Sequence, residues 1–369
     1  MRIAIDATPI VPSRKGIGVV AEGLIAACRP DSALGNALIF VDRSFADEAR
    51  RMWPERNFFP VGIGSSLIWE TVQLRRLLTR NSIDLLLTLR ERTLVPQGTK
   101  SLVWLFEVPD HRVKLLLAGD AGAYRRMVAR HSIGRFARVA RRTSRFVVSS
   151  SFTRSDLIER YGVSPDRIST IHPGVAPHFS NYVADDIRSS PRTRYVLHFA
   201  TGDLRENSPN AIRAFAGACG RLAPDIGLVL AGVPEHERTA IAGLLDGLGI
   251  SARTKVRGYI AASEMPTLFA GADVYLDPTL VEGFGLQLLE AMSVGTCVVA
   301  SNRSSVSEIV GDAGVLVAPD DVNGMSDALV SLLGNAAERR AVADRGKARA
   351  AQFSWDAAAA AFNELVKTI

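Results

Sequence analysis

The sequence predicts an α/β protein of two doubly wound domains, each a parallel sheet covered by helices on both faces. Short β-branched runs alternate with helical patterns along the whole chain, which is typical of parallel sheets buried on both sides. At 369 residues the chain is long enough for two hydrophobic cores. A polar stretch without periodicity, Phe179–Thr193, predicts the linker between them.

Apolar runs rich in β-branched residues predict the strands. Those of the first half are Arg2–Ala7, Leu38–Val41, Ile83–Thr88, Ser101–Phe106 and Arg145–Val148. Those of the second half are Tyr195–Phe199, Ile226–Ala231, Lys255–Tyr259, Ala272–Asp277, Cys297–Ala300 and Gly314–Val317. Because ligands of such sheets bind beyond the carboxyl ends of the strands, the residues that follow these runs are the candidates for a site.

The composition indicates an ordinary globular protein. Apolar residues make up 47% of the chain and charged residues 22%, which excludes a disordered class. No apolar run approaches the roughly 18 residues of a membrane helix, and the N-terminus opens with a strand pattern and not a targeting signal. The 3 cysteines lack metal-type spacing. We therefore expect a cytoplasmic protein with no metal or cofactor.

The charge is unevenly distributed. Residues 1–178 hold 27 Lys and Arg against 16 Asp and Glu, a net +11, whereas the remainder carries −5. The densest basic stretch, Tyr124–Arg145, predicts either a helix that lies on an anionic membrane surface or one that covers a sheet with its arginines in water. Aromatic residues that would stack on bases are not interleaved there, so we expect no nucleic acid partner.

The most informative motif places two carboxylates eight residues apart, Glu282 and Glu290, around a glycine-flanked aromatic turn. After Gly285 apolar residues recur every third position, so a helix begins there and carries Glu290 on its second turn. Backbone amides at such a loop-to-helix junction suit a diphosphate, and the carboxylates suit sugar or ribose hydroxyls. The alternative is a glycine turn with two surface glutamates.

Other candidate residues follow predicted strands. Gly16–Gly18 follows the first strand but lacks the full dinucleotide fingerprint, so it indicates close backbone approach to a ligand without a nicotinamide cofactor. Arg205 precedes a helix near Pro209 and is either a phosphate clamp or part of a solvated turn. The segment Glu107–Arg112 groups an acid, a histidine and arginine at a strand end.

Together these motifs resemble the retaining glycosyltransferases of family 4. The resemblance covers most of the chain and is strongest from Lys255 to Trp355, in the segments Val256–Tyr259, Glu282–Glu290, Glu308–Gly314 and Phe353–Trp355. In the first half it covers Gly16–Gly18, Val148–Leu157, Tyr161–Ile168 and His172–Val175. It implies the GT-B fold, in which two Rossmann-like domains face each other across a cleft. Residues 1–180 would bind the acceptor, residues 190–354 would bind the nucleotide sugar, and helix 355–369 would pack back on the first domain.

The resemblance also implies roles for single residues. Glu282 and the following backbone would hold the sugar hydroxyls and phosphate, Glu290 the ribose diol, and the backbone at Tyr259 the base. The donor site implied in this way contains Gly16, Gly18, Thr201, Arg205, Asn207, Tyr259, Gly283, Phe284, Gly285, Leu286 and Glu290.

Two departures from the family pattern concern charge and catalysis. Where the family has an Arg and a Lys that neutralise the diphosphate, this chain has Thr201 and Glu206, so either Arg205 or the basic pair Arg14–Lys15 must replace them. Where the family has His-Asp after the fourth strand, this chain has Phe106 and Glu107. We therefore expect Glu282, with Glu107 or His111, to carry the catalytic role.

The function implied is the transfer of a hexose with retention of the anomeric configuration. The best candidate for the donor is GDP-mannose, which would supply mannose. The acceptor would be a glycan or a lipid-pyrophosphate-linked glycan of a surface polysaccharide (O-antigen, capsule or exopolysaccharide), and the protein would be peripheral on the inner face of the plasma membrane. Two alternatives stay open: a GT-B sugar-nucleotide epimerase, and a sugar-nucleotide-binding protein with weakened catalysis.

Overall fold

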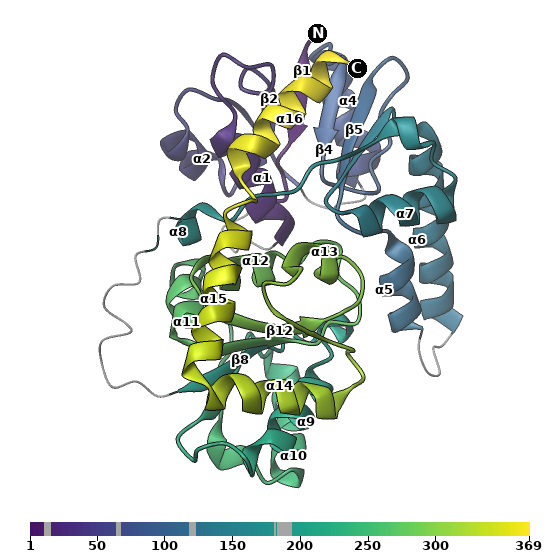
Figure 1. The fold of residues 1–369 in the computed structure, drawn as a ribbon. Coiled ribbons are helices and arrows are strands. Elements are labelled where there is room, and N and C mark those ends of the chain that lie inside the picture. Colours follow the sequence, from purple (N-terminus) through teal and green to yellow (C-terminus); the bar gives the residue numbers. More distant parts are fainter. Residues whose placement is uncertain (11–15, 64–67, 118–122, 181, 183–193) are drawn as a thin grey trace. The chain divides into compact units, whose positions relative to one another are not determined.

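The computed structural model describes residues 1–10, 16–63, 68–117, 123–180, 182 and 194–369 (Figure 1). The chain divides into two compact units. Unit 1 contains Met1–Ala176 and Phe353–Ile369, and unit 2 contains Pro177–Gln352. The predicted linker Phe179–Thr193 lies almost entirely outside the described residues.

The sheet of unit 1 is parallel, in the order β3-β2-β1-β4-β5-β6-β7. Its strands are β1 (Ile3–Asp6), β2 (Leu38–Asp42), β3 (Asn57–Val61), β4 (Leu85–Thr88), β5 (Lys100–Leu105), β6 (Arg145–Val148) and β7 (Ile168–Thr170). The chain reverses its direction across the sheet between β1 and β4. The carboxyl ends of these two strands therefore form the crevice where doubly wound sheets bind ligands.

Helices α1 (Gly16–Ala27) and α16 (Trp355–Lys367) lie side by side in unit 1 (Figure 1). Trp355 packs edge-on against Trp104 of β5, with ring centroids 6.2 Å apart. A Cβ atom at Gly23 would come within 2.2 Å of the Trp355 ring, so the glycine is required for this close approach. The other helices of unit 1 are α2 (Ala46–Met52), the π-helical turn η1 (Trp69–Gln73), α4 (Leu74–Arg80), α5 (Pro109–Leu116), α6 (Ala123–Arg142) and α7 (Ser151–Tyr161).

The sheet of unit 2 is also parallel, in the order β10-β9-β8-β11-β12-β13, and it reverses between β8 and β11. Its strands are β8 (Tyr195–Phe199), β9 (Gly227–Ala231), β10 (Thr254–Val256), β11 (Val274–Asp277), β12 (Cys297–Ser301) and β13 (Val315–Val317). Its helices are α8 (Pro177–Ser180), α9 (Ser208–Cys219), α10 (Arg238–Gly247), α11 (Met265–Gly271), α12 (Leu286–Ser293), α13 (Val306–Val310), α14 (Val322–Gly334) and α15 (Ala336–Ala350). Alternate residues of β11 and β12 pack with α9 and α14 in one core.

The predicted α/β fold class with parallel sheets is confirmed, and each strand predicted from the sequence is present. Two edge strands were missed. Pro60 lies within β3, and a proline argues against a strand unless the strand is at an edge. The other, β7, has only 3 residues. Along the described parts of the chain, none of the helices has the length and apolar character needed to cross a membrane.

Candidate functional site

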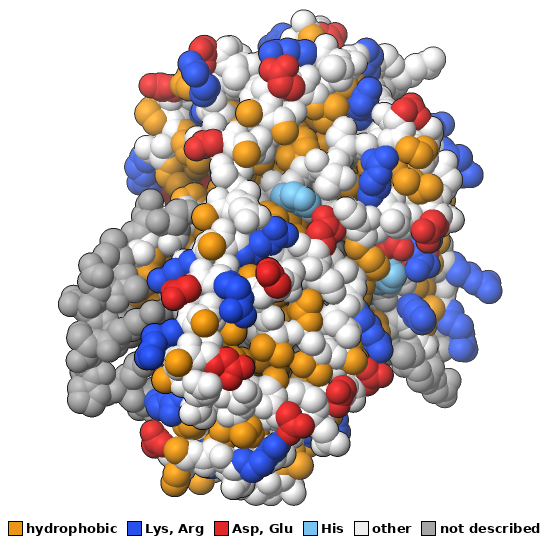
Figure 2. Space-filling view, in the orientation of Figure 1, with side chains coloured by type: hydrophobic (Ala, Val, Ile, Leu, Met, Phe, Trp, Pro, Cys, Tyr) orange, Lys and Arg blue, Asp and Glu red, His pale blue; other side chains and the backbone are white. Residues whose placement is uncertain are grey.

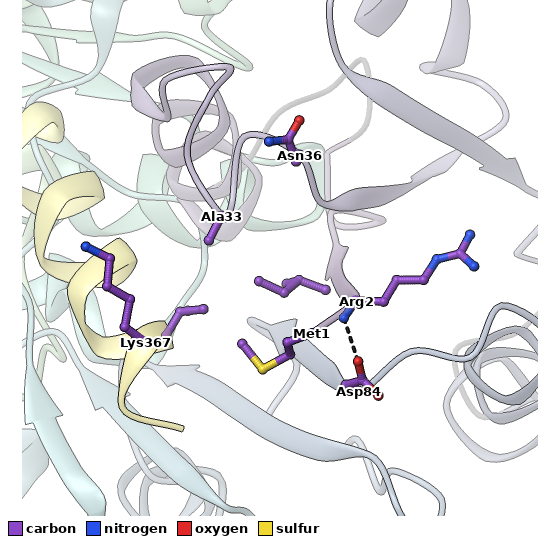
Figure 3. Close-up of a pocket in the computed structure, with 8 residues that line it drawn as sticks. Met1, Arg2, Ala33, Asn36, Asp84 and Lys367 are labelled. Carbon is purple, nitrogen blue, oxygen red and sulfur yellow. Dashed lines mark hydrogen bonds between the residues drawn. The ribbon is translucent and has the colours of Figure 1, made fainter.

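An open hollow in unit 1 lies at the wrong end of its sheet to be a strand-end ligand site (Figure 3). Residues at the amino ends of β1 and β4 contribute to its wall, and there the Arg2 backbone N–H donates to Asp84 over 2.6 Å. Its lining includes Met1, Arg2, Ala33, Asn36, Asp84 and Lys367. Doubly wound sheets bind ligands at the opposite, carboxyl ends of their strands, so the candidate site lies at those ends and not in this hollow.

In unit 2 two loops meet at the carboxyl ends of β8 and β11. The Arg205 carbonyl accepts hydrogen bonds from the Leu280 backbone N–H (2.8 Å) and from the Thr279 hydroxyl (3.0 Å). The Asn207 side-chain amide donates to the carbonyls of Pro278 (3.1 Å) and Pro319 (2.7 Å). Asn207 itself has a left-handed backbone with φ of 56°, which asparagine tolerates better than most residues. Its structural effect is to tie the two loops together.

The turn before α12 is fixed by the loop that follows β12. The Glu282 backbone N–H donates to the Ser304 hydroxyl (2.9 Å), and the Ser305 hydroxyl donates to the Glu282 carbonyl (2.7 Å). Gly285 has φ of 100°, a conformation that favours glycine, and α12 begins at the next residue. Gly283, Phe284 and Gly285 are buried, and Leu286 is partly buried. The predicted loop-to-helix junction, with Glu290 on the second turn, is confirmed.

Glu290 is a buried carboxylate that lacks a protein partner among the described residues. The residue is only 7% exposed, and neither a hydrogen bond nor a charge from a described residue contributes to the pKa of its side chain. Burial raises the pKa of Glu290 to about 8. Burial of this carboxyl group disfavours its charged form, and a ligand that supplies hydroxyl donors would stabilise that form.

Two further carboxyl groups, Glu206 and Asp277, lie near each other, and Asp277 also lies near Glu282. Glu206 accepts hydrogen bonds from the backbone N–H (2.6 Å) and the hydroxyl (2.5 Å) of Thr201. Burial raises the pKa of Glu206 to about 7. Burial, followed by the charge of Glu282, raises the pKa of Asp277 to about 7 as well. The sequence analysis missed Asp277, although its place at the end of a predicted strand was a usable signal.

The cation of this loop is already engaged in an ion pair. Arg205 donates through Nε (3.0 Å) and Nη2 (2.7 Å) to the two carboxylate oxygens of Asp203. The described charged groups around Thr201 and Glu206 therefore have a net charge that is zero or negative. The alternative cations, Arg14 and Lys15, lie outside the described residues.

Three other predicted donor-binding residues, Tyr259, Gly16 and Gly18, are described by their exposure and by the space around them. Tyr259 follows β10 at the edge of the sheet and is 69% exposed. A Cβ at Gly18 would meet the Pro9 carbonyl oxygen at 2.8 Å, so packing alone requires this glycine. A Cβ at Gly16 would meet no described atom within 4 Å, which leaves its backbone open to approach.

His111 is held by a neighbouring helix. Its Nε2 lies 2.6 Å from Oδ2 of Asp156 on α7, and the other oxygen of Asp156 accepts from Arg160 Nε at 2.6 Å. Burial would raise the pKa of Asp156, but the hydrogen bonds from His111 and Arg160 hold it below its usual range. Glu107 is partly buried between β5 and α5. The structure thus places both residues at one strand end and commits Nε2 of His111 to Asp156.

Comparison with known proteins identifies the chain's relatives. The family model described as glycosyl transferases group 1 matches residues 185–349, and the model described as Glycosyltransferase Family 4 matches residues 33–179. The O-antigen chain mannosyltransferase B of Escherichia coli is 30% identical over 220 residues, which cover 56% of this chain and 56% of that protein. The MMP alpha-(1->4)-mannosyltransferase of Mycolicibacterium hassiacum is 31% identical over 228 residues, which cover 60% of this chain and 54% of that protein. The chain spans a little over half the length of these relatives.

Solved structures share the whole architecture. WaaG, a glycosyltransferase involved in lipopolysaccharide biosynthesis, matches with a TM-score of 0.75 and 15% identity over 98% of this chain and 99% of that chain. HepE of Anabaena in complex with UDP and glucose matches with a TM-score of 0.72 and 18% identity over 100% of both chains. At such identities the likeness shows the fold, which is the two-domain GT-B fold.

Replacing Glu290 by glutamine should stabilise the ligand-free protein, increasingly so at higher pH. The folded-state pKa of about 8 lies above the ordinary 4.5, so between these values the folded protein retains a proton that the unfolded chain has lost. Each rise in pH through that window therefore removes stability, and glutamine cannot titrate. We expect Glu290→Gln to gain roughly 1–3 kcal/mol at pH 8 and much less at pH 5, measured by urea unfolding.

The matched control is Glu235→Gln, since the Glu235 side chain is 88% exposed. The difference in free energy of unfolding between Glu235→Gln and the native protein should stay constant over the same pH range. A Glu290→Gln difference that is equally constant would contradict the inference that this buried carboxylate lacks a partner.

Proposed function

Since the chain belongs to the family 4 type of GT-B glycosyltransferases, we propose that it transfers a hexose from a nucleoside diphosphate sugar to an acceptor hydroxyl with retention of configuration. The observation that carries this proposal is the turn and helix from Glu282 to Glu290 at the crevice of the second sheet. A buried carboxylate without a described partner, on the second turn of a helix whose first turn offers backbone amides, suits a nucleoside diphosphate sugar.

In this proposal each group has a separate task. Glu290 accepts the hydrogens of the ribose diol, and Glu282 with the backbone of Gly283–Gly285 holds the sugar and phosphate. Retention follows from a front-face reaction in which the departing diphosphate takes the acceptor's proton, so neither a protein base nor a metal is required. The protein then contributes orientation and stabilisation of the charge that develops at the anomeric carbon. Glu107 and His111 are proposed to contact the sugar from unit 1.

The proposed donor is GDP-mannose and the proposed acceptor is a glycan, free or linked to a lipid pyrophosphate, in surface polysaccharide synthesis. Two relatives are named mannosyltransferases, and one of these names refers to the O-antigen chain. The net charge of +11 over residues 1–178 favours an anionic acceptor or surface near unit 1.

The proposed membrane contact is the face formed by α5 and α6. Figure 2 shows Lys and Arg side chains gathered over the part of unit 1 where Figure 1 labels these helices. Exposed apolar side chains lie among them: Leu116 is 49% exposed, Met127 60% and Val128 48%. A basic surface with protruding apolar residues suits peripheral binding to the anionic inner leaflet of a plasma membrane.

One observation favours a second candidate, a sugar-nucleotide-binding protein with weakened catalysis. The positions expected to hold two cations hold Thr201 and Glu206, and Arg205 is paired with Asp203. A diphosphate leaving group would then be poorly stabilised. Tight donor binding without turnover on any acceptor would identify this case.

A thermal-shift series with GDP-, UDP-, ADP- and dTDP-sugars tests the donor. We expect GDP-mannose to give the largest rise in Tm, because binding to the folded state alone adds stability in proportion to the logarithm of ligand concentration over Kd. A larger rise with another base would overturn the GDP-mannose assignment but leave the transferase intact.

Replacing Glu282 by alanine should reduce turnover by roughly 100-fold or more without unfolding the protein, because the lost contact acts on the reacting sugar. Turnover is measured as nucleotide release that depends on acceptor, and folding by circular dichroism. The matched control is Glu264→Ala, which removes another glutamate of unit 2 whose side chain is 52% exposed. An unchanged rate in Glu282→Ala would remove the central assignment, and nucleotide release without acceptor would favour the epimerase.

Flotation with vesicles containing anionic lipid tests the membrane contact. We expect the native chain to float with such vesicles at moderate salt, and Arg126→Glu/Arg130→Glu to lower binding at least about tenfold, since each basic residue near the surface contributes about 1 kcal/mol. The control, Arg213→Glu/Arg221→Glu, makes the same charge change at exposed positions of unit 2. Equal loss in both variants would indicate a nonspecific charge effect and contradict this face.

A further inference from the structure

The loop that follows β8 holds a pair of polar side chains at the crevice of the second sheet. Thr201 lies two residues beyond the end of β8, and Glu206 ends the short 3-10 turn η3 (Leu204–Glu206). Oε2 of Glu206 accepts from the Thr201 backbone N–H over 2.6 Å, and Oε1 of Glu206 lies 2.5 Å from the Thr201 hydroxyl oxygen. Both oxygens of this carboxyl group therefore face a single residue, Thr201.

The two members of this pair differ in their access to solvent. Thr201 is exposed, whereas Glu206 is partly buried. Ligands of doubly wound sheets approach the loops at the carboxyl ends of the strands, so the Thr201 hydroxyl can be reached by such a ligand. The hydrogen bond to Glu206 holds that hydroxyl in place. What the hydroxyl can offer to a ligand therefore depends on the protonation state of Glu206.

Carboxyl groups outnumber cations around this pair. The titratable groups that face it from its own loop and from neighbouring elements are Asp203, Arg205, Glu237 of the turn η4 (Glu235–Glu237), Tyr275 and Asp277 of β11, and Glu282 beyond Asp277. The cation among them, Arg205, donates through Nε and Nη2 to Asp203. Neighbouring carboxyl groups ionise together only at a large electrostatic cost. Burial raises the pKa of Glu206 to about 7 against the opposing effect of the Thr201 hydrogen bonds.

Protonation of Glu206 reverses one hydrogen bond of the pair. An ionised carboxylate only accepts, so the Thr201 hydroxyl must then direct its hydrogen at Oε1 of Glu206. A carboxyl group protonated at Oε1 donates to the Thr201 oxygen instead, and the hydroxyl hydrogen can point at a ligand. The ionised pair thus presents a negative charge to the crevice, whereas the protonated pair is neutral and presents a hydrogen-bond donor.

We propose that Glu206 takes up a proton from solvent when the donor binds, and that the Thr201 hydroxyl then donates to an oxygen of the diphosphate. The inference rests on the proposed function, because it takes the ligand to be a nucleoside diphosphate sugar. The pair supplies a neutral hydrogen-bond donor where the family pattern has two cations. A bound diphosphate favours the protonated state, because like charges repel. Donor affinity therefore falls as the pH rises above the pKa of Glu206, which is about 7.

Calorimetric titration in buffers of different ionisation enthalpy counts the protons taken up with the donor. The probe is the sugar nucleotide with the largest thermal shift, which we expect to be GDP-mannose. Per bound donor, the native chain should take up roughly half a proton more than Glu206→Gln at pH 7 and nearly one more at pH 8, because glutamine cannot titrate. Glutamine can still donate to the Thr201 oxygen, so Glu206→Gln should bind about tenfold more tightly than the native chain at pH 8. Proton exchange at Glu290 is common to both chains and cancels in this difference.

Variants of Thr201 keep the test valid if Glu206→Gln fails to fold. Thr201→Val removes the exposed hydroxyl and should weaken donor binding at least about tenfold, since a hydrogen bond to a charged group is lost. Thr201→Ser keeps the hydroxyl and should restore binding. The control, Thr239→Val, makes the same change at another exposed threonine of unit 2 and should leave binding unchanged. The matching nucleoside lacks the diphosphate, so it should bind equally to Thr201→Val and to the native chain, a result that a purely structural role of Thr201 would not give.

The outcome is separable from that of the proposed function. An equal proton count in the native chain and in Glu206→Gln, or donor binding by Thr201→Val as tight as that of the native chain, would overturn the proton uptake and leave the transferase intact. Failure of the native chain to bind any of the four kinds of sugar nucleotide would overturn both.

Discussion

The site of unit 2 depends on a single backbone constraint, the left-handed conformation of Gly285. With φ of 100° the chain turns from the loop into α12 within one residue, so that Glu282 stays on the loop and Glu290 enters the interior. Hydrogen bonds from Ser305 and to Ser304 hold the loop side of this turn. The spacing of the two carboxylates therefore becomes a fixed geometry, in which one is partly exposed and the other is buried without a described partner.

Near this turn, unit 2 carries several carboxyl groups with raised pKa values. In unit 2 Asp277 lies near both Glu282 and Glu206, and burial raises the pKa values of Asp277 and Glu206 to about 7. A carboxyl group that keeps its proton near neutral pH donates a hydrogen bond to a phosphate oxygen, a task that arginine or lysine performs elsewhere. An approaching anion would favour the protonated state further. The positions of Thr201 and Glu206 thus hold a hydroxyl and a carboxyl group with a raised pKa where the family pattern has two cations.

The sequence was sufficient to predict what local pattern determines. Apolar runs located the strands of both sheets, and helical spacing after Gly285 placed Glu290 on the second turn of its helix. The edge strand β3 was missed because Pro60 interrupts its pattern. The partner of His111 could not be predicted from the sequence either. Asp156 lies 45 residues away along the chain, and only the folding of α7 beside α5 brings its carboxylate within 2.6 Å of His111. Pairings of this kind depend on tertiary packing, which periodicity does not encode.

The two sheets share one topology but differ in the charged groups at their crevices. Each reverses its strand order at its first strand, and each places a carboxyl group at that point: the buried Asp6 in unit 1 and the partly buried Asp277 in unit 2. In unit 1 Asp6 and Glu70 lie against the guanidinium groups of Arg90 and Arg135, so each carboxylate there has a cationic partner. In unit 2 the guanidinium of Arg205 is bound to Asp203, and Glu290 adds a buried carboxyl group to which no hydrogen bond from a described residue contributes. Such a crevice suits a ligand rich in hydroxyl donors. The chain thus pairs its carboxylates with guanidinium groups in one crevice and leaves a carboxylate without a described donor in the other.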